Sequence, residues 1–157
     1  MHSIDAACQS QKWMRIMTMP SSHLATSRPV SPGTPGKILI VEDDPGLQLV
    51  LVELFTTMGY ATLTASNAAA ALTTLKNNRD VIMLFSDVVM PGEMDGIGLA
   101  DAARKIYPEL RILLASGYPQ KDLTTKTLPK YEAFISKPYR SSELEEQMRE
   151  LGIYPPG

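Results

Sequence analysis

The sequence predicts one α/β domain, in which a five-stranded parallel sheet is covered by helices on both faces. Two observations predict this class. Short apolar runs without polar alternation recur along the chain, as expected for strands that are buried on both faces. Segments with helical periodicity lie between these runs, and strands that alternate with helices form parallel sheets through right-handed crossovers. The chain of 157 residues is long enough for one such domain.

Five segments are predicted to be strands. Four of them are short apolar runs, and the fifth is a weaker segment that follows Gly59. In chain order, the predicted strands cover residues 38–41, 60–65, 81–85, 112–115 and 133–135.

The first predicted helix is marked by residues typical of helix ends. Asp44 stands at the N-cap position, Pro45 at the first helical position and Gly59 just after the last turn. One face of this helix should pack on the sheet. The apolar residues assigned to that face are Leu47, Val50, Leu51, Leu54 and Met58.

The second predicted helix covers residues 68–76 and has Ser66 or Asn67 as its N-cap. Residues 121–128 are a poor helix candidate, because their threonines are β-branched and a proline follows. We expect a short or mobile element there. The apolar residues of the second helix that should face the core are Leu72 and Leu75.

Two further helices complete the predicted fold. One runs from about Ile97 to Ile106, after a turn at Asp95-Gly96. The last begins at Ser142, whose spacing to Glu145 matches a capping box. Its expected core residues are Leu144, Met148 and Leu151.

Residues 1–36 differ in composition from the rest of the chain. They are rich in Pro, Ser and Gly with few large apolar side chains, which predicts a disordered N-terminal tail. A cleaved secretion signal is disfavoured because Arg15 interrupts the only apolar cluster. An organelle transit peptide is an alternative, and so is a later translation start that would make part of the tail an artefact. The folded domain is expected over 37–152, with a short tail over 153–157.

Composition excludes several classes of function. No apolar run approaches the roughly 18 residues that span a membrane, and a net charge of −2 without a basic cluster in the main body disfavours binding to nucleic acid. Residues 37–157 contain no His, Cys or Trp, which excludes Ser-His-Asp and Cys-His catalysis and zinc sites built on imidazole or thiolate. The single cysteine, Cys8, cannot form an internal disulfide and fits a cytoplasmic protein.

Charged and hydroxyl side chains follow four of the predicted strands. Ligands of open parallel sheets bind at the carboxyl ends of strands, where this chain has Glu42, Asp43, Asp87, Ser116 and Lys137. If the first and third strands are neighbours, Asp43 and Asp87 lie close together, and like charges about 4 Å apart repel by roughly 4 kcal/mol. Lys137 and a divalent cation would balance these charges, and all-oxygen ligands favour Mg²⁺. A carboxylate in such a site can accept a phosphoryl group.

Four motifs resemble the receiver domain of two-component response regulators. They occur in the expected order, and the four residues Asp43, Asp87, Ser116 and Lys137 are separated by 44, 29 and 21 residues. The resemblance covers about residues 37–152 and implies a flavodoxin-like (CheY-like) doubly wound sheet with strand order 2-1-3-4-5. The motifs are Ile-Leu-Ile-Val-Glu-Asp-Asp (38–44), Phe-Ser-Asp-Val-Val-Met-Pro-Gly (85–92), Leu-Leu-Ala-Ser-Gly (113–117) and Phe-Ile-Ser-Lys-Pro (134–138).

The resemblance implies a phosphoacceptor and a metal site. Asp87 would take a phosphoryl group from a phosphohistidine on a histidine kinase or a histidine phosphotransfer protein. Asp43, Asp87 and the backbone carbonyl of Val89 would bind Mg²⁺ directly, and Glu42 would bind it through water.

The resemblance also implies a conformational switch. Ser116 would supply the switch hydroxyl, Lys137 would pair with the phosphoryl group, and Phe134 would rotate inward as the hydroxyl residue moves. Ser116 is usually Thr in the family, so the switch loses a methyl group here. The chain would then be a single-domain signalling module rather than an enzyme, with altered binding to a protein partner as its output.

Two alternatives to this function stay open. An aspartate-nucleophile phosphatase also uses Asp and Mg²⁺ on a doubly wound sheet, but it normally has a second carboxylate two residues after the nucleophile, where Val89 stands. A receiver-like interaction module that no longer accepts phosphate is the other alternative. The full set of acidic, hydroxyl and lysine residues argues against it.

Overall fold

The structure is a computed structural model, and it describes residues 35–117 and 132–157. Residues 1–34, which make up most of the predicted tail, lie outside the described residues, and so does the predicted short or mobile element over 121–128. Within the described ranges no helix is long and apolar enough to cross a membrane.

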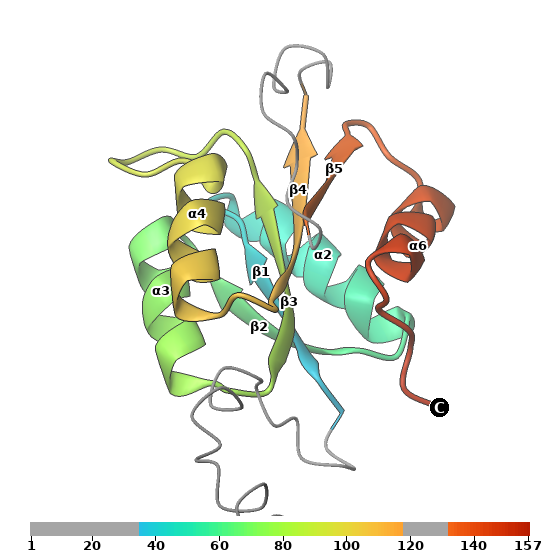
Figure 1. The fold of residues 1–157 in the computed structure, drawn as a ribbon. Coiled ribbons are helices and arrows are strands. Elements are labelled where there is room, and N and C mark those ends of the chain that lie inside the picture. Colours follow the sequence, from blue (N-terminus) through green and yellow to red (C-terminus); the bar gives the residue numbers. More distant parts are fainter. Residues whose placement is uncertain (1–34, 118–131) are drawn as a thin grey trace, which may run out of the picture.

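Five strands form one parallel sheet in the order β2-β1-β3-β4-β5 (Figure 1). This order confirms the predicted fold class and places the first and third strands side by side. Each strand was predicted within two residues of its observed ends. The strands are β1 (Lys37–Val41), β2 (Ala61–Ala65), β3 (Val81–Asp87), β4 (Arg111–Ser116) and β5 (Glu132–Ser136).

Helices cover both faces of the sheet (Figure 1). Two of them pack on one face, and their bounds are α3 (Ala68–Asn77) and α4 (Gly96–Ile106). The other two pack on the opposite face, and their bounds are α2 (Pro45–Thr57) and α6 (Ser141–Glu150).

Successive residues of β1 alternate between two apolar cores. Leu39 and Val41 face α3 and α4, whereas Ile38 and Ile40 face α2 and α6, and all four side chains are buried. A strand that is covered on both faces needs no polar position, which explains why the sequence shows no alternation. The buried apolar side chains supply most of the favourable free energy of folding.

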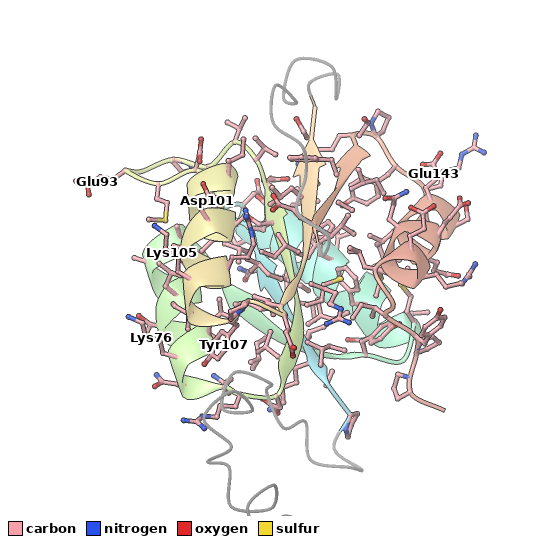
Figure 2. The ribbon with its side chains drawn as sticks, in the orientation of Figure 1. Lys76, Glu93, Asp101, Lys105, Tyr107 and Glu143 are labelled. Atoms are coloured by element: carbon pink, nitrogen blue, oxygen red, sulfur yellow. The ribbon has the colours of Figure 1, made fainter. Side chains whose placement is uncertain are left out.

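The outer faces of the helices carry charged side chains. Lys76 on α3, Lys105 on α4 and Glu143 on α6 point away from the sheet (Figure 2). At the end of α4, the Tyr107 hydroxyl donates a hydrogen bond of 2.7 Å to the Leu75 carbonyl and so joins α4 to α3.

The predicted apolar face of α2 is partly wrong. Leu47 and Val50 are 39% and 59% exposed, and the buried residues of this helix are Leu51 and Phe55. Apolar side chains lie all around the first two turns of this helix, so periodicity alone fits more than one rotation. The Phe55 ring packs edge-on against Phe85 at a centroid distance of 5.3 Å and fixes the rotation that is observed.

The N-caps of α2 and α3 follow the predicted chemistry. The Asp44 carboxylate accepts a hydrogen bond of 2.9 Å from the Leu47 amide, as predicted. Asn67, rather than Ser66, caps α3 by accepting one of 2.8 Å from the Ala70 amide.

The predicted capping box of the last helix is wrong. Only half of such a box forms, and it lies two residues earlier. The Glu143 carboxylate accepts a hydrogen bond of 2.7 Å from the Arg140 amide, α6 begins at Ser141, and the arginine side chain has no acceptor for the reciprocal bond. Glu145 instead pairs with Arg149, one turn later on the exposed face. Beyond α6, Ile153 packs in the core on the α2 and α6 side.

Candidate functional site

The five residues that follow or end the strands lie at one edge of the sheet. Glu42 and Asp43 come directly after β1, Asp87 is the last residue of β3, and Ser116 is the last residue of β4. Lys137 follows β5, and its amide donates a hydrogen bond of 2.7 Å to the Ser116 carbonyl. The parallel order of the strands therefore brings together residues that lie far apart in the sequence.

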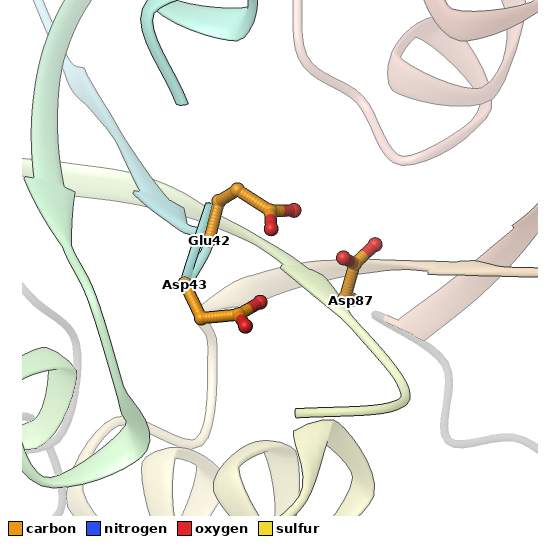
Figure 3. Close-up of side chains that lie close together, drawn as sticks. All are labelled: Glu42, Asp43 and Asp87. Atoms are coloured by element: carbon orange, nitrogen blue, oxygen red, sulfur yellow. The ribbon is translucent and has the colours of Figure 1, made fainter. Parts of the chain in front are cut away.

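Three carboxylates converge at this edge (Figure 3). One oxygen from each of Glu42, Asp43 and Asp87 lies within 4.8 Å of the others, and Glu42 and Asp43 reach from the end of β1 toward Asp87 on β3. Glu42 is buried, Asp87 is half-buried and Asp43 is exposed. The cluster thus opens to solvent on the Asp43 side.

One lysine partly balances the negative charge of the cluster. The Lys137 Nζ forms an ion pair with the Asp87 Oδ1. Three carboxylates against one ammonium group leave an excess of negative charge, and like charges at such distances repel by several kcal/mol. Oxygen ligands from three carboxylates at a site open to water fit a hydrated divalent cation of the Mg²⁺ type.

The electrostatic environment alters the acidity of two side chains. Burial, together with a hydrogen bond to Asp87, raises the pKa of Glu42 to about 7, although the Asp44 amide, which donates to Glu42 Oε1 at 3.1 Å, opposes this shift. Burial and then the charges of Asp87 and Glu42 raise the pKa of Tyr139 to about 12. Burial is the largest cause of both shifts, and the neighbouring carboxylates add to each of them.

The peptide of Asp87 is held against the start of α4. The Gly96 amide donates a hydrogen bond of 2.8 Å to the Val88 carbonyl, and a Cβ atom at Gly96 would lie 2.0 Å from the Asp87 carbonyl oxygen. Only glycine allows this approach. The buried hydroxyl of Ser86 donates to the same Asp87 carbonyl at 3.0 Å.

Sequence reasoning missed this role of Gly96. The Asp95-Gly96 pair indicated a turn and a helix start, and the structure confirms both, because Asp95 caps α4. The close approach to Asp87 is a tertiary contact, for which a glycine beside a helix N-cap gives only a weak signal.

Two residues of the predicted site lie outside the carboxylate cluster. Phe134 is on β5, paired in register with Leu114, and its half-buried side chain packs on the core that faces α3 and α4. Val89 lies two residues after Asp87, and this residue is 63% exposed.

Comparisons with known proteins agree on one family. The family model described as "Response regulator receiver domain" matches residues 38–149. The response regulator receiver protein CpdR of Brucella abortus is 32% identical over 118 residues, which cover 74% of this chain and 97% of the relative. Sporulation initiation phosphotransferase F of Bacillus subtilis is 31% identical over 115 residues, which cover 72% of this chain and 90% of the relative.

A solved structure is similar over the same region. It is the response regulator protein TrrA of Thermotoga maritima in complex with Mg²⁺-BeF, which is 27% identical and has a TM-score of 0.65. The match covers 74% of this chain and 98% of the other.

Proposed function

Because the chain belongs to the family of response regulator receiver domains, the signalling domains of two-component systems, we propose that it accepts a phosphoryl group on Asp87 in a Mg²⁺-dependent reaction. The observation that carries this proposal is the convergence of Glu42, Asp43 and Asp87 within 4.8 Å, with Lys137 paired to Asp87. Phosphoryl transfer to a carboxylate requires such a site, in which the nucleophilic carboxylate lies beside groups that neutralise charge.

The proposed metal ligands are Asp43, Asp87 and the backbone carbonyl of Val89, with Glu42 binding through a water molecule. The excess negative charge of the cluster supports this assignment. When bound, Mg²⁺ would neutralise charge between the carboxylates and the incoming phosphoryl oxygens. The TrrA structure, which was solved with Mg²⁺-BeF, adds support from a relative.

In the proposed transfer, a carboxylate oxygen of Asp87 attacks the phosphorus of a donor phosphohistidine. A P–O bond forms as the P–N bond breaks, and the histidine leaves with the electron pair of that bond. Lys137 already contacts Asp87, so its ammonium group is in position to pair with the phosphoryl oxygens. The Ser116 hydroxyl would donate to the same oxygens.

The proposed output is a change in partner binding. Ser116 would move toward the phosphoryl group, and Phe134 would turn inward from its half-buried position on β5. The donor would be a histidine kinase or a histidine phosphotransfer protein, as the resemblance to receiver domains implies. We place this exchange in the cytoplasm, where ATP charges such donors.

Phosphorylation by a small donor tests the proposal directly. The wild-type chain, incubated with acetyl phosphate and Mg²⁺, is expected to gain the mass of a single phosphoryl group, and EDTA should prevent this gain. Intact-mass spectrometry measures both results. Continuous turnover of many phosphate esters would favour the phosphatase alternative, and the absence of any adduct would favour the interaction module.

The raised pKa of Glu42 makes Mg²⁺ binding depend on pH. Because its pKa is about 7 without metal and 4.5 is its ordinary value, a proton must leave Glu42 when the cation binds near neutral pH. Affinity for Mg²⁺ should therefore weaken as the pH falls below about 7. The folding stability of the metal-free domain should instead decrease as the pH rises. The raised pKa of Glu42 stabilises the fold at low pH, and this contribution is lost as the pH rises toward about 7.

Thermal unfolding with and without Mg²⁺, measured from about pH 5.5 to about pH 8, tests this linkage. The increase in Tm that Mg²⁺ produces should grow with pH and level off above about 7. In Glu42→Gln this pH dependence should largely disappear. If Mg²⁺ raised the Tm of the wild type by the same amount at both ends of this pH range, the result would contradict the prediction.

A further inference from the structure

One side chain outside the carboxylate cluster holds the backbone from which two of its members extend. The Gln48 Nε2, on α2, donates hydrogen bonds of 3.2 Å to the carbonyl of Glu42 and of 3.2 Å to the carbonyl of Ala65. Both partners are acceptors, so the amide nitrogen rather than its oxygen must face them. The half-buried Gln48 therefore ties the end of β1 to the end of β2.

These bonds restrict the peptide that leads into Asp43. The Glu42 carbonyl belongs to the Glu42–Asp43 peptide group, so fixing this oxygen fixes the plane from which the Asp43 side chain leaves. The Glu42 amide donates to the same Ala65 carbonyl at 3.1 Å, and the Asp44 amide donates to Glu42 Oε1 at 3.1 Å. The whole turn is thus held at several points.

A restraint of this kind is needed because the cluster repels itself. Without a cation, Glu42 and Asp43 face Asp87 with an excess of negative charge, and the lowest-energy response of a free turn would be to rotate away. Asp43 is the exposed member of the cluster and lies on the segment that Gln48 fixes.

We propose that Gln48 is a positioning residue for the metal site, which holds the Glu42–Asp43 turn in the conformation that binds the cation before the cation arrives. This inference rests on the proposed function, because it assumes that the cluster binds Mg²⁺. Loss of a residue that orients metal ligands typically weakens metal affinity by about 10- to 100-fold.

Gln48→Met tests the proposal, since methionine has a similar length but no hydrogen-bond donor. Titration calorimetry should show Mg²⁺ affinity lower by about tenfold or more. In the acetyl phosphate reaction, the Mg²⁺ concentration for half-maximal rate should rise by the same factor, while the rate at saturating Mg²⁺ should change little. The matched control is Gln147→Met, at a half-buried glutamine of α6, a helix that follows β5 rather than β1, and this change should leave both values unchanged.

A metal-free measurement separates positioning from a merely structural role. The backbone amide resonances of Asp43 and Asp44 should shift in Gln48→Met without Mg²⁺, while those of the core strands stay in place. Gln48→Asn, which keeps the amide but is one methylene shorter, should show the same loss of affinity in a folded protein.

Different results would contradict Mg²⁺ binding by the cluster and the positioning role of Gln48. If the wild type does not bind Mg²⁺, the proposed function fails. If the wild type binds Mg²⁺ and both Gln48 variants bind it equally well, or if Gln147→Met weakens binding as much, the role of Gln48 is overturned.

Discussion

Asp87→Asn is expected to reduce phosphorylation by acetyl phosphate by about a thousandfold or more, the scale on which loss of a nucleophile acts. The amide oxygen of asparagine is a poor nucleophile and cannot form the acyl phosphate. The same change removes one of the charges that raise the pKa of Glu42, so this pKa should fall toward its ordinary value. Intact mass measures the first effect, and the pH dependence of Tm measures the second.

The control for this variant is Asp101→Asn. Asp101 is an exposed aspartate of α4 (Figure 2), is paired with Arg104, and does not belong to the carboxylate cluster. The Asp101→Asn variant should gain a phosphoryl group to the same extent as the wild type. An adduct of undiminished yield in Asp87→Asn would show that another residue accepts the phosphoryl group.

Gly96→Ala is expected to destabilise the domain strongly. The new Cβ would lie 2.0 Å from the Asp87 carbonyl oxygen and 2.8 Å from its carbon, and neither backbone atom can move without displacing the end of β3. Overpacking of this kind costs about 2 to 3 kcal/mol. Urea denaturation should show this loss, and phosphorylation should fall with it because the Asp87 peptide is displaced.

A second glycine in the same helix provides the control. A Cβ at Gly98 would meet the flexible Met94 side chain at 3.0 Å and the Asp95 carboxylate at 3.4 Å. Alanine is favoured over glycine inside a helix by about 1 kcal/mol, so Gly98→Ala should leave stability unchanged or slightly higher. Equal stability of Gly96→Ala and Gly98→Ala would contradict the close approach of α4 to Asp87.

The strands could be predicted because burial on both faces produces short apolar runs without polar alternation. β1, β3 and β4 are almost entirely apolar in their buried parts, as the two-sided core requires. The order of the strands was not derivable from these runs. It was implied by the resemblance to receiver domains, and the observed pairing confirms it.

The rotation of α2 could not be predicted because apolar residues surround the helix. Leu47, Leu49 and Val50 remain exposed, although each is as apolar as the buried Leu51. The contacts of Phe55 and Gln48 select the rotation, and both depend on residues far away in the sequence. The capping box of α6 was misplaced for a related reason, since acidic residues occur at several positions of its first two turns.

The residues of the candidate site that lie at strand ends could be predicted from the sequence. The carboxyl ends of parallel strands share one edge, so Asp43, Asp87 and Lys137 could be assigned to the same edge from their positions. Their closeness depended on the strand order, which the resemblance to receiver domains implied. The supporting contacts of Gly96 and Gln48 could not be found in this way. They are tertiary contacts with the backbone of another element, which the pattern of residue types does not encode.

We propose that the carboxylates at the ends of β1 and β3 form one cation site, in which Asp87 alone becomes phosphorylated. The most direct test is to locate the modified residue. The chain is phosphorylated with acetyl phosphate, the acyl phosphate is reduced with borohydride to give homoserine, and peptides are sequenced by tandem mass spectrometry. We expect homoserine at position 87, only when Mg²⁺ is present during phosphorylation; modification at Asp43 or another residue, or equal labelling in EDTA, would contradict the claim.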